Sequence, residues 1–111
     1  MIGQFRGNIA TLCGVKAAIV AETIWDQLDE QISDDTWEEH YGHAWCRCSQ
    51  TMMTVINPFL SEHMVKDAVS ELLKKKVILK DSFNESKFDH TNWYAFTDYG
   101  ERMMLEGGEE E

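Results

Sequence analysis

The chain has 111 residues, 43% hydrophobic and 11% aromatic, and this composition indicates one globular domain. No apolar run reaches the ~18 residues of a membrane span, and the N-terminus lacks the apolar core of a signal peptide. Three cysteines are an odd number, which argues against a closed disulfide framework. We therefore expect a cytoplasmic protein with reduced thiols and no membrane partner.

The net charge of −10 is unevenly distributed along the chain. Residues 1–42 contain two basic and eight acidic residues, and residues 91–111 contain one basic and six acidic residues. Residues 43–90 contain seven basic and six acidic residues, so this segment is close to neutral. Proteins that bind nucleic acid on their own usually present a basic face. Any such face is expected to be small here and to lie in the central segment.

Apolar residues recur at helical spacing over residues 15–32 and predict the longest helix. A short helix is expected before it at residues 8–12, ended near Gly14, and a short helical turn after it at residues 36–39. Residues 44–48 predict a short strand. The predicted apolar face of the long helix consists of Val15, Ala18, Ile19, Ala21, Trp25, Leu28 and Ile32.

Two helices are predicted at residues 49–56 and 61–75, separated by a turn at residues 57–60 that contains Pro58. Ser49 and Ser61 precede them at positions where a hydroxyl can cap the free backbone amides. The first helix is expected to supply Met52, Met53, Val55 and Ile56 as its apolar positions. The second is expected to bury the stripe Val65, Ala68, Val69 and Leu72.

Residues 77–83 and 91–97 are rich in β-branched and aromatic residues and predict two strands joined by the polar loop 84–90. Alternation places Tyr94 and Phe96 on one face of the second strand, opposite Trp93 and Ala95. Asp98 is expected to cap a last helix at residues 99–105, which directs Tyr99, Met103 and Met104 toward the core. Residues 106–111 are expected to form an acidic flexible tail after a domain that spans residues 1–105.

The order helix, strand, helix, turn, helix and hairpin is the layout of a winged helix-turn-helix domain, mainly α with a small antiparallel β-sheet. Four sequence markers carry a more specific likeness. They are Gly14-Val15-Lys16-Ala17-Ala18-Ile19, Trp45-x-x-Cys48-Ser49, Pro58-Phe59-Leu60-Ser61 and Asn84-x-x-Lys87-Phe88-Asp89-x-Thr91-x-Trp93-Tyr94. In this order the markers resemble the winged-helix domains of phage and plasmid replication proteins of the replisome-organiser and initiator type.

The resemblance covers residues 14–97 and implies DNA contact through the second helix of the helix-turn-helix and through the wing. It also implies an origin in a phage or another mobile element. Members of this family tend to have glycine after the second helix, where this chain has Lys76. Lys76 is therefore expected either to adopt a left-handed backbone conformation or to change how the helix ends.

Double-stranded DNA is the predicted partner, in replication or transcription control. Ser61, His63, Lys66 and Ser70 are expected to enter the major groove. The expected phosphate contacts come from Arg47, Asn84, Ser86, Lys87 and His90. The alternative is an acidic protein-interaction module, such as a phage inhibitor of a host nucleic-acid enzyme, because the acidic flanks would attract a basic partner.

The run His40-x-x-His43-x-x-Cys46-x-Cys48 contains residue types that bind zinc, but a Cys-x-Cys strand also places two small residues inward. We predict no metal and no cofactor. The sequence shows no phosphate loop, paired-carboxylate motif or nucleophile motif, so we do not expect an enzyme. A homodimer interface near Trp25 and Trp37 is left open, because burial within the monomer explains both tryptophans equally well.

Overall fold

The computed structural model describes residues 5–109, with side chains up to residue 107. This part of the chain forms five helices and one four-stranded antiparallel sheet, which confirms the prediction of helices with a small antiparallel sheet. The elements in chain order are α1 (Gly7–Cys13), α2 (Val15–Ser33), β1 (Glu38–His40), β2 (His43–Arg47), α3 (Gln50–Ile56), α4 (Glu62–Lys74), β3 (Ile78–Asp81), β4 (Trp93–Phe96) and α5 (Asp98–Glu109).

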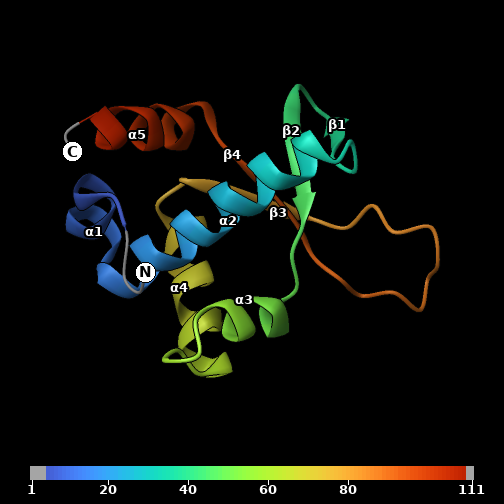
Figure 1. The fold of residues 1–111 in the computed structure, drawn as a ribbon, viewed down its shortest axis with the longest axis horizontal. Coiled ribbons are helices and arrows are strands. Elements are labelled where there is room, and N and C mark those ends of the chain that lie inside the picture. The colour runs from blue at the N-terminus through green and yellow to red at the C-terminus, as the bar shows by residue number, and fades with distance from the viewer. Residues whose placement is uncertain (1–4, 110–111) are drawn as a thin grey trace.

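The long helix α2 lies at the centre of the molecule (Figure 1). It packs against α4 and β2, while α1 packs against both α2 and α5. The sheet order is β1-β2-β4-β3, so β4 lies between β2 and β3 although β2 precedes it by two helices in the chain. The loop between β3 and β4 projects from the body of the molecule (Figure 1). No described helix is long and apolar enough to span a bilayer.

The core forms where α2 and α4 meet one face of the sheet. Val65, Ala68, Val69 and Leu72 are all buried, which confirms the predicted stripe of α4. The alternation predicted for β4 is also confirmed. Tyr94 and Phe96 belong to the main core, whereas Trp93 and Ala95 form a second cluster with Trp45 on the other face of the sheet.

Both predicted serine caps are confirmed. The Ser49 hydroxyl accepts a hydrogen bond from the Met52 amide at 3.0 Å, and the Ser61 hydroxyl accepts one from the Met64 amide at 3.1 Å. At the other end of α4, Lys76 adopts a φ of 62°. The Lys76 and Val77 amides donate to the carbonyls of Leu73 and Leu72, which is the Schellman pattern. Lys76 thus takes the conformation that glycine usually supplies.

The helical turn predicted at residues 36–39 is wrong, because Glu38–His40 forms strand β1 and pairs with β2. His40 pairs with His43 across a two-residue turn in which Tyr41 has a φ of 58° and Gly42 a φ of 80°. Positive φ at both turn residues matches the twist of a tight hairpin. Pairing with β2 therefore prevailed over the local signals for a helical turn.

Several residues predicted to face the core are exposed. Val15 and Ile32, at the two ends of α2, are 51% and 47% exposed, since the buried residues of this helix lie between Ala17 and Ile24. The seven-residue helix α3 buries Met53 alone. Its other predicted core residues, with Phe59 from the following turn, form an exposed apolar patch of Met52, Val55, Ile56 and Phe59.

The C-terminal helix differs from the prediction at both ends. Its cap is Thr97 and not Asp98, since the Thr97 hydroxyl accepts from the Gly100 amide at 2.9 Å. Tyr99 is 44% exposed, whereas Met104 is buried as predicted. The helix continues to Glu109, so residues 106–109 are helical where the sequence predicted a tail, and Glu110 and Glu111 lie outside the described residues.

The N-terminal segment explains why α5 continues. Arg6 Nε donates to the Met104 carbonyl and Asn8 Nδ2 to the Met103 carbonyl, both at 2.8 Å. Gly107 lies so close to this segment that a Cβ there would be 2.7 Å from Asn8 Oδ1. These are contacts between opposite ends of the chain, which local sequence patterns do not reveal.

Candidate nucleic-acid interface

The predicted reading residues of α4 are all exposed. The buried stripe occupies one side of the helix, so at 3.6 residues per turn the opposite side carries His63, Asp67, Ser70 and Lys74. Lys66 and Glu62 lie on one flank of that outer side. Ser61 precedes the helix, and its hydroxyl oxygen serves as the cap while its proton remains able to donate to a ligand.

On the outer side of α4 a histidine lies next to an aspartate. His63 Nε2 lies 3.2 Å from Asp67 Oδ2, one helical turn away, with both side chains more than two-thirds exposed. An approaching phosphate therefore meets the Asp67 carboxylate beside His63. Lys66 is left as the cation in the first half of the helix, and it points to a flank of the outer side.

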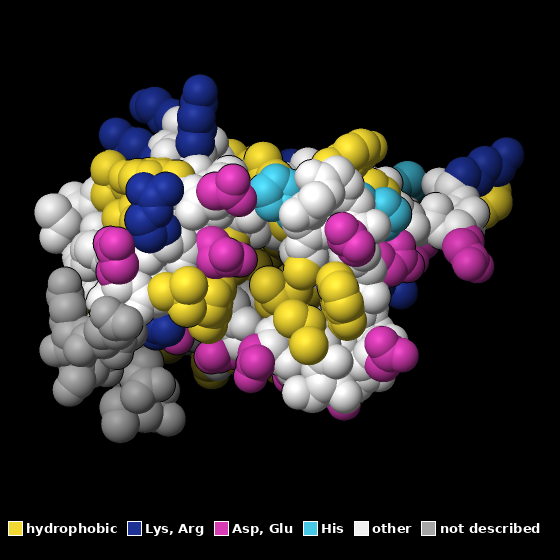
Figure 2. Space-filling model, turned by 90° about the horizontal axis from the view of Figure 1, so that it is seen from above, with side chains coloured by type: hydrophobic (Ala, Val, Ile, Leu, Met, Phe, Trp, Pro, Cys, Tyr) yellow, Lys and Arg dark blue, Asp and Glu magenta, His cyan; other side chains and the backbone are white. Residues whose placement is uncertain are grey.

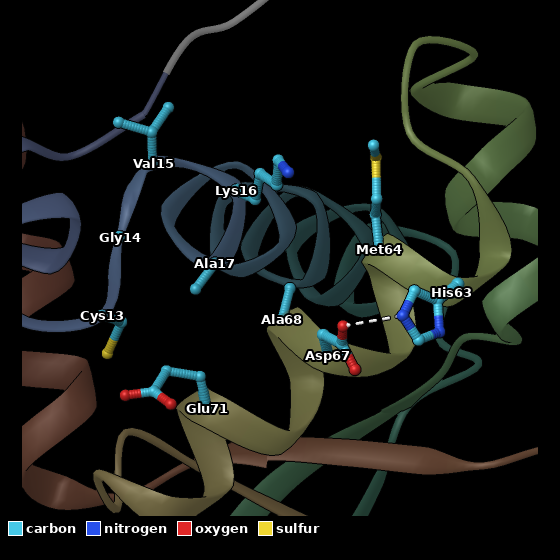
Figure 3. A pocket seen from close by; sticks show the side chains of 10 residues that line it. All are labelled: Cys13, Gly14, Val15, Lys16, Ala17, His63, Met64, Asp67, Ala68 and Glu71. Carbon is cyan, nitrogen blue, oxygen red and sulfur yellow. Dashed lines mark ion pairs between the residues drawn. The ribbon is translucent and has the colours of Figure 1, made fainter.

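A groove of about 580 Å³ runs beside α4, between this helix and the junction of α1 with α2 (Figure 3). Its wall includes small side chains, Ala17 and Ala68, and carries the Asp67 and Glu71 carboxylates on the α4 side. Partial burial, followed by the charge of Glu71, raises the pKa of the Cys13 thiol. These carboxylates repel a phosphate backbone, so this groove does not suit DNA.

The loop between β3 and β4, residues 82–92, is called the wing loop below. Asn84 organises its base. Its Nδ2 donates to the carbonyls of Asp89 and Thr91 at 2.9 and 2.8 Å and lies 3.1 Å from Ser82 Oγ. Its Oδ1 accepts from Trp93 Nε1 at 2.8 Å. The amide group of Asn84 is therefore already used within the loop, and its role here is to shape it.

Arg47 also has partners within the chain. Its Nη2 lies 2.7 Å from Asp89 Oδ2, and its guanidinium lies 5.9 Å from the centroid of the Trp93 ring. Hydrogen bonds from Thr91, first from its backbone amide, and then the charge of Arg47 hold the pKa of Asp89 below its usual range. This ion pair links β2 to the wing loop, and it offsets the charge of Arg47 toward an incoming phosphate.

The remaining predicted wing residues lie at the exposed end of the loop. Ser86, Lys87 and His90 are exposed. Sequence reasoning did not assign a binding role to Phe88, which is 80% exposed beside Lys87. A large aromatic residue among the polar residues 84–90 was the signal that could have identified it. The structure thus leaves Lys87, Phe88 and His90 as a group that a ligand can reach.

The cations of the molecule are not gathered on one face. Figure 2 shows Lys and Arg side chains along one edge of the molecule and at the tip of the projecting loop, with Asp and Glu side chains between them. Four exposed lysines lie at or just after the end of α4 and on β3, namely Lys74, Lys75, Lys76 and Lys80. A ligand that used α4 and the wing loop would meet few lysines.

The cysteines and histidines of the zinc-like run do not converge. Cys46 and Cys48 are both fully buried and face the core, where burial raises the pKa of each thiol to about 12. His40 stacks on the Phe83 ring with centroids 3.7 Å apart and contacts Glu38 at 2.8 Å. Within the described residues, no group of three or more His, Cys, Asp and Glu side chains is arranged to hold a metal ion.

Comparison of the chain with protein-family models, with curated proteins and with solved structures gives no match.

Proposed function

We propose that this chain is a winged-helix DNA-binding protein of phage or mobile-element type, acting in replication or transcription control. One observation carries the proposal. The elements follow in the order α2, β2, α3, α4, β3 and β4, and β2 pairs with β4, which pairs with β3. This order supports the proposal because it is the one expected of a helix-turn-helix followed by a β wing, in which the second helix of the pair enters the major groove.

In this arrangement α4 is the recognition helix. Ser61, His63, Lys66 and Ser70 meet the bases and the adjoining backbone. Ser86, Lys87 and His90 meet the backbone from the wing loop, while Arg47 and Asn84 hold that loop in shape. Because few lysines are within reach, binding is expected to depend on salt with a shallow slope.

Fluorescence anisotropy with pooled random duplexes at two salt concentrations tests the proposal. We expect Lys66→Ala and Lys87→Ala each to weaken binding roughly 3- to 10-fold for all sequences alike, and to reduce the salt slope by about one. Lys75→Ala is the matched control, since this exposed lysine lies at the far end of α4. If the unaltered protein forms no complex with any duplex at low salt, the proposal is wrong.

A second candidate is a winged-helix module that binds protein. It is favoured by the apolar patch of Met52, Val55, Ile56 and Phe59, which lies within an uncharged run of residues 48–61 in a strongly acidic chain. Exposed apolar patches often mark protein interfaces. Capture of a host protein that is lost on Val55→Asp, together with absent DNA binding, would favour this candidate over the first.

A further inference from the structure

The tip of the wing loop presents an aromatic ring to solvent. Phe88 is 80% exposed, more than any other large hydrophobic side chain among the described residues. Figure 2 shows this tip extending from the body of the molecule, with hydrophobic, basic and acidic side chains at its end.

The loop that carries Phe88 is held by specific contacts. The Phe88 amide donates to Ser86 Oγ at 3.2 Å, and the Asp89 amide donates to the Ser86 carbonyl at 3.1 Å. Below this turn, Asn84 bonds the carbonyls of Asp89 and Thr91, and Asp89 is tied to Arg47. The backbone is therefore arranged before any ligand arrives, which lowers the entropic cost of binding.

The surroundings of the ring fit a nucleic acid. Lys87 Nζ lies 5.6 Å from the centroid of the Phe88 ring, and His90 is exposed on the same loop. Of the two acidic residues of the wing loop, Asp89 is paired with Arg47 and Glu85 is exposed. An aromatic ring next to a lysine is suited to bind a nucleotide, because bases stack on aromatic side chains while cations contact the phosphate backbone of the nucleic acid.

We propose that Phe88 stacks on a nucleobase while Lys87 contacts the adjoining phosphate. This inference rests on the proposed DNA-binding function and assigns the wing loop a contact to a base face. The base comes either from a duplex step that the ring wedges open or from an unpaired strand. Both sources offer the same π-face, and they are distinguished by the DNA used in the test.

The experiment uses the full chain with DNA that contains 2-aminopurine, whose fluorescence reports its stacking. Three forms are compared: a duplex, a forked duplex and a single strand. We expect Phe88→Ala to weaken binding to at least one form about tenfold or more and to abolish the fluorescence change. Phe88→Trp is expected to restore both, and the form that responds identifies the source of the base. Leu105→Ala, which removes a 56% exposed side chain from α5, is the control.

The possible failures are distinguishable. If Phe88→Ala binds all three forms like the unaltered protein, with the same fluorescence change, while Lys66→Ala and Lys87→Ala still weaken binding, the stacking inference is overturned and the DNA-binding proposal stands. If the unaltered protein binds none of the three forms, the DNA-binding proposal fails and the inference fails with it. Phe88 is exposed, so unchanged melting temperatures are expected to show that these variants remain folded.

Discussion

At the residue scale, Gly100 lies where the first turn of α5 touches the backbone that leads into β3. Its amide donates to the Thr97 hydroxyl, and that hydroxyl lies 2.6 Å from the Lys76 carbonyl, to which it donates. A Cβ at Gly100 would lie 1.9 Å from the Val77 carbonyl oxygen. Because this neighbour is backbone, it cannot move aside as a flexible side chain would. The position requires glycine for close approach and not for an unusual φ.

We predict that Gly100→Ala lowers the free energy of unfolding by at least about 2 kcal/mol, since overpacking outweighs the helix propensity that alanine adds. Urea denaturation measures the effect. The matched control is Gly7→Ala at the start of α1, where a Cβ would meet nothing within 4 Å. This control is expected to be neutral or slightly stabilising, and equal losses at both positions would contradict the explanation.

Side-chain partners are also decided at this scale, and the sequence did not reveal them. Asn84 and Arg47 were predicted to contact phosphates because of their residue types. The structure gives both of them partners 5 to 42 residues away in the chain. A donor is free for a ligand only when no closer acceptor exists, and folding brings such acceptors together. Within the described residues, Lys66 and Lys87 have no such partner from elsewhere in the chain. They therefore remain the stronger candidates for phosphate contacts.

At the element scale, the period of hydrophobic residues predicted α4 and β4 well. The stripe of Val65, Ala68, Val69 and Leu72 and the alternation of Trp93 with Tyr94 are local patterns that burial on one face enforces. The same reasoning predicted too many buried residues in α3. A helix of seven residues makes fewer than two turns, and this one buries Met53 alone. It missed β1, whose strand character depends on pairing with β2.

The N-cap of α4 gives a prediction at this scale. Ser61→Ala is expected to lower stability by about 1 kcal/mol, because the Met64 amide loses the hydroxyl that accepts its hydrogen bond. The control is Ser70→Ala, which removes an exposed serine that lies inside the same helix and is not its N-cap. This variant is expected to change the free energy of unfolding by less than about 0.5 kcal/mol. Thermal and urea unfolding of both variants measures the difference. Equal effects would show that the cap contributes nothing.

At the scale of the whole molecule, charge is the dominant feature. The chain has ten basic and twenty acidic residues, and the protein measures 39 × 30 × 26 Å. At 0.01 M salt the screening length is about 30 Å, so acidic groups repel one another across the entire protein, whereas at 0.15 M it is about 8 Å. Among the described residues, ion pairs such as Arg6 with Glu22 at 2.7 Å involve a minority of the acidic groups and offset little of this repulsion.

We therefore predict that raising salt from about 0.01 to 0.15 M increases the melting temperature by a few degrees, because screening reduces self-repulsion in the folded state. Differential scanning calorimetry measures this shift. The same change in salt is expected to weaken any DNA complex, since phosphate contacts lose counterion release. A higher melting temperature of the free protein together with a weaker complex would distinguish the screening of self-repulsion from the weakening of phosphate contacts. A melting temperature that falls with salt would show that ion pairs dominate.

The sequence by itself determined the main helices and strands, the two serine caps, the buried stripe of α4 and the alternation of β4. These follow from periodicity and from groups within a few residues of one another. Only the tertiary structure decided that Lys76 takes the left-handed conformation, that β1 pairs with β2, that α5 extends to Glu109 against α1, and which polar side chains remain free. The physical reason is that the extension of α5 and the partners of Arg47 depend on contacts between segments that are distant in the chain, whereas the Lys76 turn and the β1–β2 hairpin are choices between local alternatives that the sequence pattern did not distinguish.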